Sequence, residues 1–337
     1  MPISFGKFVR DCSRLREIAL NGPATTTCYR RNRLLEKRFT LYQLLNDQLE
    51  AKEIHVSGTD MYRVTKVDND VYLNRSMEST ALLKFLHQKL QTERDTVIQT
   101  SPRCTLGEML GRIGINEMTI SLSALGTQAD GDTFRRADVW SEKSQLFGDK
   151  GLKKPILGIH NDLGGRYLAE LLHVSSFRRE VVSPGHPIKT EMRVGFHDPG
   201  TLEQTAIWAK RNGFIGVPTN RFLIQFSRDY PRQLKLERVT SFAGYLEMLF
   251  RPLFEVTKDP SICPALDALL ADTTGFDVVG DESEPTSAIS ETMPPPELWT
   301  SPEQPPFVYY AYYFYANIQS LNNFRLLVGK SLLQRRL

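Results

Sequence analysis

"KVDNDVYLNRSMES", residues 66–79, has the outline of a strand that runs into the start of a helix. Its valines alternate with polar neighbours, which is the period of a half-buried strand. Ser79 then supplies a cap for an amphipathic helix over 79–91. Asp70 and Tyr72 stand at the end of this strand, and ligands bind at the strand ends of α/β proteins. The stretch therefore predicts one strand–helix unit with a candidate site at its rim.

The same alternation continues downstream of this unit. Upstream, apolar residues recur at helical spacings over 3–50, with a break at Asn21–Pro23. Downstream, the pattern predicts helices over 162–179, 201–213, 241–260 and 307–327, and strands over 190–197, 220–230 and 275–283. This alternation favours a parallel sheet with helices outside it. Four strand–helix units are predicted, whereas a closed (β/α)8 barrel needs eight.

Composition narrows the class of protein. The chain has 337 residues, 41% hydrophobic and 24% charged, with a formal net charge of +3, which gives no reason to expect nucleic acid. The densest basic stretch, residues 28–38, is more typical of a solvated helix face than of a polyanion site. No apolar run approaches the roughly 20 residues of a membrane span. Scattered single cysteines fit a reducing compartment. We therefore expect a soluble, cytoplasmic protein, alone or within a larger assembly.

Familiar catalytic motifs are missing from the sequence. It contains no phosphate-binding loop, no dinucleotide fingerprint and no nucleophile elbow, and its six histidines form no H-x-H pair. His197 is the best single candidate, because it ends a predicted strand. Asp277, Asp281 and Glu282 follow another strand, where they could form an acid/base couple, a cation site or merely an acidic loop. Arg228 ends the neighbouring strand, where it could pair with these carboxylates or hold a phosphate.

Eight stretches in order along the chain resemble the AMP deaminase family: GPATTTCYRRNRLLEKRFTLYQLLN, RVTKVD, LLKFLHQKL, GGRYLAELL, RFLIQFSRDY, RPLFEVTKDP, GFDVVGDES and QPPFVYYAYYFYANIQSLN. The resemblance implies an α/β fold with an N-terminal helical extension and a (β/α)8 TIM-type barrel. It also implies a zinc-generated hydroxide that attacks C6 of AMP and yields IMP and ammonia. For this chain we expect the extension over 1–62 and roughly the first half of the barrel over 63–337, with a loop-rich insertion near 95–160 and a Pro-rich excursion near 284–306.

The chain departs from the family at the positions that carry chemistry. Asp70 and Tyr72 occupy the positions of the family's zinc-binding H-x-H pair, and a neutral tyrosine is a poor substitute for imidazole. Further family residues are replaced by Thr80, Gln128, Arg135, Val139, His197, Asp198, Pro199 and Gly280. The third zinc histidine, the catalytic glutamate and the zinc aspartate belong to family segments beyond the position of Leu337. We therefore expect no catalytic residue and no bound zinc.

These departures predict an inactive AMP deaminase-like protein that acts as a regulatory or structural subunit. Residual binding of a purine nucleotide is expected through Gln225, Arg228, Asp281, Glu282 and Lys143. Two alternatives remain: half of an active deaminase completed by another chain, and a scaffold component without nucleotide. An open half-barrel has two unpaired edge strands and an inner face that we expect to be apolar. We therefore predict that a protein partner or a second copy of the chain covers this half-barrel.

Overall fold

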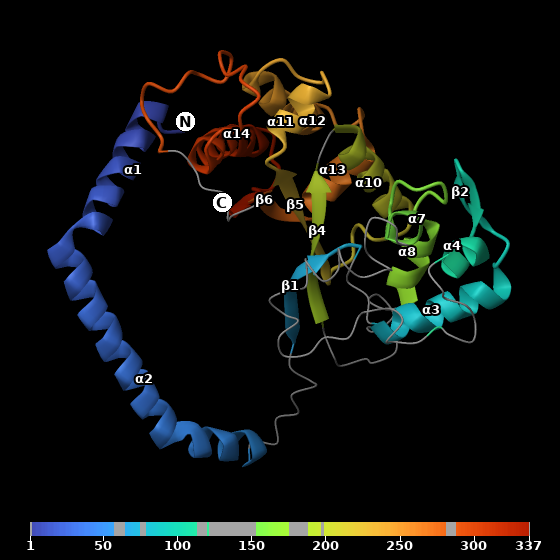
Figure 1. The fold of residues 1–337 in the computed structure, drawn as a ribbon, viewed down its shortest axis with the longest axis horizontal. Coiled ribbons are helices and arrows are strands. Elements are labelled where there is room, and N and C mark those ends of the chain that lie inside the picture. Colours follow the sequence, from blue (N-terminus) through green and yellow to red (C-terminus); the bar gives the residue numbers. More distant parts are fainter. Residues whose placement is uncertain are drawn as a thin grey trace.

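The fold is built around one curled parallel sheet (Figure 1). The computed structural model describes residues 2–56, 65–74, 79–112, 120, 153–174, 188–196, 199–280 and 288–336. The sheet has the order β1-β4-β5-β6-β7, and each pair of neighbours is parallel. Its strands are β1 (Lys66–Tyr72), β4 (Ile188–Phe196), β5 (Asn220–Ser227), β6 (Thr273–Val279) and β7 (Gln334–Arg336). Strands that follow one another in space as in sequence are the arrangement of a (β/α)8 barrel, so the predicted α/β half-barrel is confirmed.

Helices cover one face of this sheet. They are α10 (Pro199–Arg211), α11 (Tyr230–Lys235), α12 (Phe242–Lys258), α13 (Pro264–Ala271) and α14 (Phe307–Leu327). The centre of the contact is aromatic: the Phe226 ring of β5 lies 5.1 Å from both Phe250 of α12 and Phe314 of α14. Most of the aromatic run at the start of α14 is buried, so the sequence-based prediction of a packing helix over 307–327 is confirmed.

The opposite face of the sheet is polar. Side chains alternate between the two faces along a strand. The neighbours of Phe226 in β5 therefore point to the face opposite the helices, and so do the residues paired with those neighbours on the adjacent strands. They include Arg193, Gln225 and Asp277, which contact one another. Glu191 lies on the same face and accepts a hydrogen bond from Thr274 Oγ1 at 2.6 Å. The described strands therefore do not present the wholly apolar inner face that we expected: Arg193, Gln225 and Asp277 contact one another there, beside the buried Leu223.

A second group of elements packs beside β1 and β4. It contains α3 (Ser79–Thr92), the antiparallel pair β2 (Val97–Thr100) and β3 (Arg103–Thr105), α4 (Leu106–Arg112), α7 (Lys153–Leu157) and α8 (Arg166–Leu172). Part of the insertion that we expected to be loop-rich thus forms a small hairpin and short helices. Residues 113–119 and 121–152 lie outside the described part of the chain.

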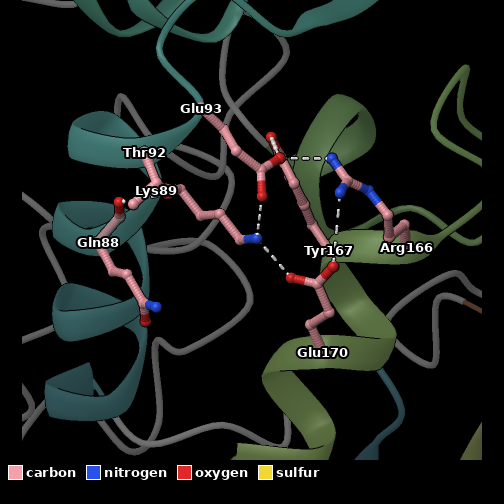
Figure 2. A network of polar contacts seen from close by, with 7 residues as sticks. All are labelled: Gln88, Lys89, Thr92, Glu93, Arg166, Tyr167 and Glu170. Atoms are coloured by element: carbon pink, nitrogen blue, oxygen red, sulfur yellow. Dashed lines mark hydrogen bonds and ion pairs between the residues drawn. The ribbon is translucent and has the colours of Figure 1, made fainter.

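A network of charged groups joins α3 to α8 (Figure 2). Lys89 Nζ contacts Glu170 Oε2 at 2.6 Å and also Glu93, while Glu93 Oε2 lies 2.5 Å from the Arg166 guanidinium. The Tyr167 hydroxyl donates a hydrogen bond to the same Glu93 oxygen at 2.9 Å. Lys89 and Glu93 are largely buried, which makes their pairing stronger than that of surface ions.

An N-terminal arm of two helices extends from this body (Figure 1). It consists of α1 (Phe5–Leu20) and α2 (Gly22–Val56), and the predicted break at Asn21 is confirmed. The start of α1 is anchored on α14: Phe5 packs against Tyr309, Tyr312 and Tyr313, with ring centroids 5.1–5.7 Å apart. Beyond this anchor α1 leads away from the body, and α2 then turns back toward the side on which β1 lies, with most of its side chains exposed.

Several predicted boundaries differ from the structure. The helix predicted over 162–179 begins only at Arg166, because Gly164 and Gly165 take positive φ angles of 59° and 71° in a turn. The strand predicted over 220–230 ends at Ser227, since Tyr230 starts α11. Residues 288–306 form turns without helix or strand, and the boundary at residue 62 lies outside the described residues. Of the helices that are described, none is long and apolar enough to cross a bilayer.

Candidate ligand pocket at the strand ends

A cavity of about 530 Å³ opens at the carboxyl ends of β1, β4, β5 and β6. This is the end of a parallel sheet at which barrel enzymes bind their ligands. Strand residues and two flanking segments form its wall: Tyr72, Leu73, Asn74, Leu157, Ile159, His160, Arg193, Val194, Gly195, Thr201, Thr205, Gln225, Ser227 and Val279. The pocket therefore combines apolar wall residues with convergent polar groups, as small-molecule sites do.

The Asp277 carboxylate is the polar centre of this region. Its Oδ2 accepts a hydrogen bond from Gln225 Nε2 at 3.1 Å and lies 3.5 Å from Nη1 of Arg193. Strand register brings these groups together, because Gln225 is paired with both Gly195 and Asp277 and Arg193 is two residues before Gly195. The Arg193 guanidinium also lies 5.8 Å from the centre of the Tyr72 ring. One cation thus links the end of β1 to the carboxylate on β6.

His160 forms part of the opposite wall. It follows α7 in a turn, and its Nε2 lies 3.2 Å from Thr205 Oγ1 on α10. The Thr205 hydroxyl donates to the Thr201 carbonyl at 2.8 Å, so it can accept a hydrogen bond from the ring. This contact holds the imidazole at the pocket wall.

Buried phenols hold the loop that follows β5. The Tyr245 hydroxyl donates to the Ser227 carbonyl, and the Tyr310 oxygen lies 3.3 Å from the Tyr230 amide nitrogen, which donates to it. Burial raises the pKa of both Tyr245 and Tyr310 well above the ordinary tyrosine value. Both phenols therefore stay neutral across physiological pH and keep their hydrogen bonds, which fixes the pocket rim.

The structure separates the residues predicted for nucleotide binding. Gln225 lines the pocket, whereas Arg228 does not. The Arg228 guanidinium lies 5.3 Å from the centre of the Phe307 ring and above Gly280, where an added Cβ would be only 2.3 Å from Nε. Asp281, Glu282, Lys143 and His197 fall outside the described residues, and so does the side chain of Asp70.

Two pocket residues were not singled out from the sequence. Arg193 stands between the buried residues Met192 and Val194 of β4, which was a usable signal, because a charged residue in a buried strand needs a partner. His160 was set aside with the other isolated histidines, and only the packing of its turn against α10 places it at the wall. Among the described residues, no group of three histidine, cysteine or acidic side chains gathers in a way that could hold a metal ion.

A second cavity of about 470 Å³ lies on the other side of His160. Arg112, Lys154 and Asp162 contribute charge to its wall. Asp162 accepts hydrogen bonds from the Thr100 side chain and backbone, which lower the pKa of its carboxyl group. Its carboxylate therefore fixes the turn that precedes α8 against β2.

A parallel half-barrel with a polar pocket at its strand ends is the architecture of barrel enzymes that act on small molecules. Comparison of sequences identifies the family: its AMP deaminase model matches residues 2–336, and this chain belongs to that family.

Individual relatives agree with this assignment. The chain is 33% identical to AMP deaminase of Dictyostelium discoideum over all of its own length and 42% of the relative's. It is 34% identical to AMP deaminase of Saccharomyces cerevisiae over 94% of its length and 39% of the relative's. For human AMP deaminase 3 the identity is 32%, over 94% and 41% of the respective lengths. The chain thus spans about 40% of the length of the curated relatives it matches.

Proposed function

We propose that this chain is a non-catalytic member of the AMP deaminase family that binds a purine nucleotide in the strand-end pocket and acts as a regulatory or structural subunit. One observation carries the proposal. Tyr72, at a position where the family is expected to place a zinc-binding histidine, has the Arg193 guanidinium over its ring. A guanidinium is a permanent cation, and a zinc ion beside it would meet repulsion rather than a ligand.

The other described groups at the strand ends do not supply the ligands or the negative charge that would let a zinc ion bind beside this cation. Asp277 already accepts a hydrogen bond from the Gln225 amide and pairs with Arg193, so its carboxylate is engaged by these groups. Imidazole, thiolate or carboxylate ligands are what a catalytic zinc site needs, usually three of them. The residues present do not fit the zinc ion of the family, and we derive no hydrolytic step through it.

Nucleotide binding is supported by the pocket itself. A volume of about 530 Å³ lies within the range of about 300–1,000 Å³ typical of small-molecule sites. Both hydrogen-bond donors and acceptors line the pocket, among them the side chains of Gln225, Thr201 and His160. Arg193 adds the positive charge that a phosphate group requires. A purine monophosphate is therefore the ligand class that the pocket supports best.

A subunit role is supported by the edges of the sheet. β1 and β7 are its outermost strands, and edge strands present backbone groups that can pair with another chain. We therefore propose that the half-barrel is completed or covered by another protein chain.

Calorimetry and an activity assay on the purified chain test this function. Titration with AMP, ATP and GTP is expected to give heat of binding for at least one of them. Metal analysis is expected to find no bound zinc, and incubation of AMP with added zinc should form no IMP. Bound zinc with turnover would instead support half of an active deaminase. No binding of any nucleotide would support a purely structural role.

A pair of variants locates the binding site. Gln225→Leu keeps the size of the side chain but removes the amide that faces the pocket, so nucleotide affinity should fall about tenfold. Gln88→Leu makes the same chemical change at an exposed position of α3 outside the pocket and should leave affinity unchanged. Equal affinities of the two variants would place the nucleotide elsewhere.

A further inference from the structure

The second cavity lies where the β2–β3 hairpin, α4 and the turn after α7 meet (Figure 1). Its volume of about 470 Å³ falls within the range of about 300–1,000 Å³ typical of small-molecule sites. Of the described residues in its wall, only His160 also lines the strand-end pocket. The second cavity is therefore a separate space, with a chemistry of its own.

Hydrogen bonds hold the wall of this cavity in place. The Asp162 carboxylate accepts a hydrogen bond from Thr100 Oγ1 at 2.7 Å, which ties the turn before α8 to β2. The Asn161 side chain donates to the Pro155 carbonyl at 2.7 Å and accepts from the Gly165 amide at 2.9 Å, which ties the same turn to α7. Because these elements are fixed without a ligand, a ligand would bind there with little cost of reorganisation.

Two cations of the wall take no part in these contacts. Arg112 ends α4 and Lys154 belongs to α7. In the part of the chain that the structure describes, neither side chain makes a hydrogen bond or a close ion pair. Hydrogen bonds from Thr100 lower the pKa of Asp162, and Lys154 adds to this effect only at longer range. The guanidinium and the ammonium group therefore keep their hydrogen-bond donors for a ligand.

The charges of the wall favour a singly charged anion. Arg112 and Lys154 carry two positive charges and Asp162 carries one negative charge, so with His160 neutral the sum is +1. A dianion such as phosphate would exceed this charge and would meet the Asp162 carboxylate. A carboxylate ligand matches the charge, and its two oxygens fit the planar donor pair of an arginine.

Buried residues form the apolar part of the wall. Ile98 and Met109 line the cavity with only 1% and 8% of their surface exposed, and Pro155 lies beside them. Apolar atoms that bind against these side chains leave water, which stabilises the complex. The favoured anion therefore carries a hydrocarbon or aromatic group in addition to its carboxylate.

From this combination we propose that the second cavity binds a small organic carboxylate. Its carboxylate group pairs with Arg112 and Lys154, and its apolar group lies against Ile98 and Met109. The proposal does not rest on nucleotide binding, because the charged and apolar groups that carry it lie outside the strand-end pocket.

Titration with benzoate tests the site. In protein labelled with ¹³C at the methionine methyl groups, the Met109 signal should shift in a saturable manner, because the aromatic ring lies next to it. Met109→Leu assigns this signal. The buried Met192 of β4 lines neither cavity, so its signal should stay in place. The absence of any Met109 shift, or a shift of Met192 alone, would overturn the proposal.

Substitution of the cations tests the pairing. Arg112→Gln and Lys154→Gln should each raise the dissociation constant of benzoate about tenfold. Arg103→Gln is the matched control, because Arg103 is an exposed residue of the same hairpin outside the wall, and it should leave the constant unchanged. All three side chains are exposed, so circular dichroism should show the same fold in each variant. Equal effects of the three substitutions would show a general effect of charge and overturn the site.

Two further probes test the class of ligand. Benzamide has nearly the same shape as benzoate but no charge, so it should bind at least about tenfold more weakly. Inorganic phosphate should displace benzoate only weakly, since it is a dianion without an apolar group. Equal binding of benzamide would overturn the role of the cations, and tighter binding of phosphate would overturn the assignment of a carboxylate.

Discussion

At the scale of single residues, the contact between Arg193 and Tyr72 carries the proposal that the end of β1 does not hold a zinc ion. The double variant D70H/Y72H would recreate the family's expected H-x-H pair at the end of β1. Two histidines remain fewer than the three protein ligands of a catalytic zinc site, and the Arg193 cation stays beside them. We expect no IMP formation from AMP and less than one zinc ion per chain by metal analysis. Restored turnover would contradict the assignment of a non-catalytic role.

A second residue-scale prediction concerns Gly165, which begins α8. Its φ angle is +71°, and an added Cβ would lie 2.4 Å from Nε1 of the buried Trp208. Gly165→Ala should therefore lower the free energy of unfolding by about 2–5 kcal/mol, from left-handed strain and overpacking together. Urea denaturation measures this change.

Gly213→Ala is the matched control for this substitution. Gly213 has nearly the same φ angle, +72°, but no neighbour within 4 Å of an added Cβ. It should lose only the conformational part, about 1–2 kcal/mol. Equal losses at both sites would show that the Trp208 contact contributes nothing.

Which residues meet in the pocket could be predicted only in part. Asp277 was recognised from the sequence as a carboxylate near a strand end, yet its partners Gln225 and Arg193 come from two other strands. Their meeting depends on strand register, and a shift of one residue would turn every side chain to the opposite face. Sequence periodicity gives the position of a strand but not the register against its neighbours.

At the scale of elements, the network between α3 and α8 predicts a pH-dependent stability. Burial alone would raise the pKa of Glu93, but hydrogen bonds from Lys89, Tyr167 and Arg166 outweigh it, and the pKa lies below the ordinary value of 4.5. A carboxyl group with a lowered folded-state pKa stabilises the fold above its unfolded pKa. This stabilisation is lost as the pH falls through the folded-state value.

Glu93→Gln should therefore cost about 1–3 kcal/mol at pH 7 and progressively less as the pH falls below about 4. Burial alone would lower the pKa of Lys89, but its hydrogen bonds to Glu170 and Glu93 outweigh burial and raise this pKa, so its charge persists through alkaline pH. Thermal melting at several pH values measures the difference. Glu247→Gln, whose pair with Arg251 on α12 is exposed, should change stability little at any pH. A loss that is the same at pH 3 and pH 7 would exclude the ionic contribution.

Long elements with a clear period were predictable, and short ones were not. The aromatic helix α14 was predicted with its observed bounds, and the break between α1 and α2 followed from Asn21 and Pro23. In contrast, α13 has 8 residues and β7 has 3, too few to establish a period. Their positions are determined by packing against α10 and pairing with β6, which sequence patterns do not report.

At the scale of the whole molecule, the contact of Phe5 with α14 holds the arm to the body. Phe5→Ala removes three aromatic pairs at this contact, each worth about 0.5–1.5 kcal/mol. Tryptic cleavage within α1 should become about tenfold faster or more, whereas the melting temperature of the body should change little. Leu20→Ala, at an exposed position of the same helix, should leave cleavage unchanged. Unaltered proteolysis of the Phe5 variant would show that other contacts hold the arm.

The polar inner face changes which surface needs a partner. Arg193, Gln225 and Asp277 contact one another on the described part of this face, and polar side chains can meet water without a large cost. The apolar surface that requires covering lies instead on α2. Interfaces of this chain are therefore expected at the edges of the sheet and along the arm, rather than across the inner face.

The anchor of the arm has a mechanical consequence. Phe5 at the start of α1 packs on Tyr312 of α14, and α1 joins α2 at Asn21. A protein that pulls on the arm would therefore strain this aromatic contact first. Because Phe314 of the same helix packs on Phe226 of β5, force on the arm would reach the helix that covers the middle of the sheet.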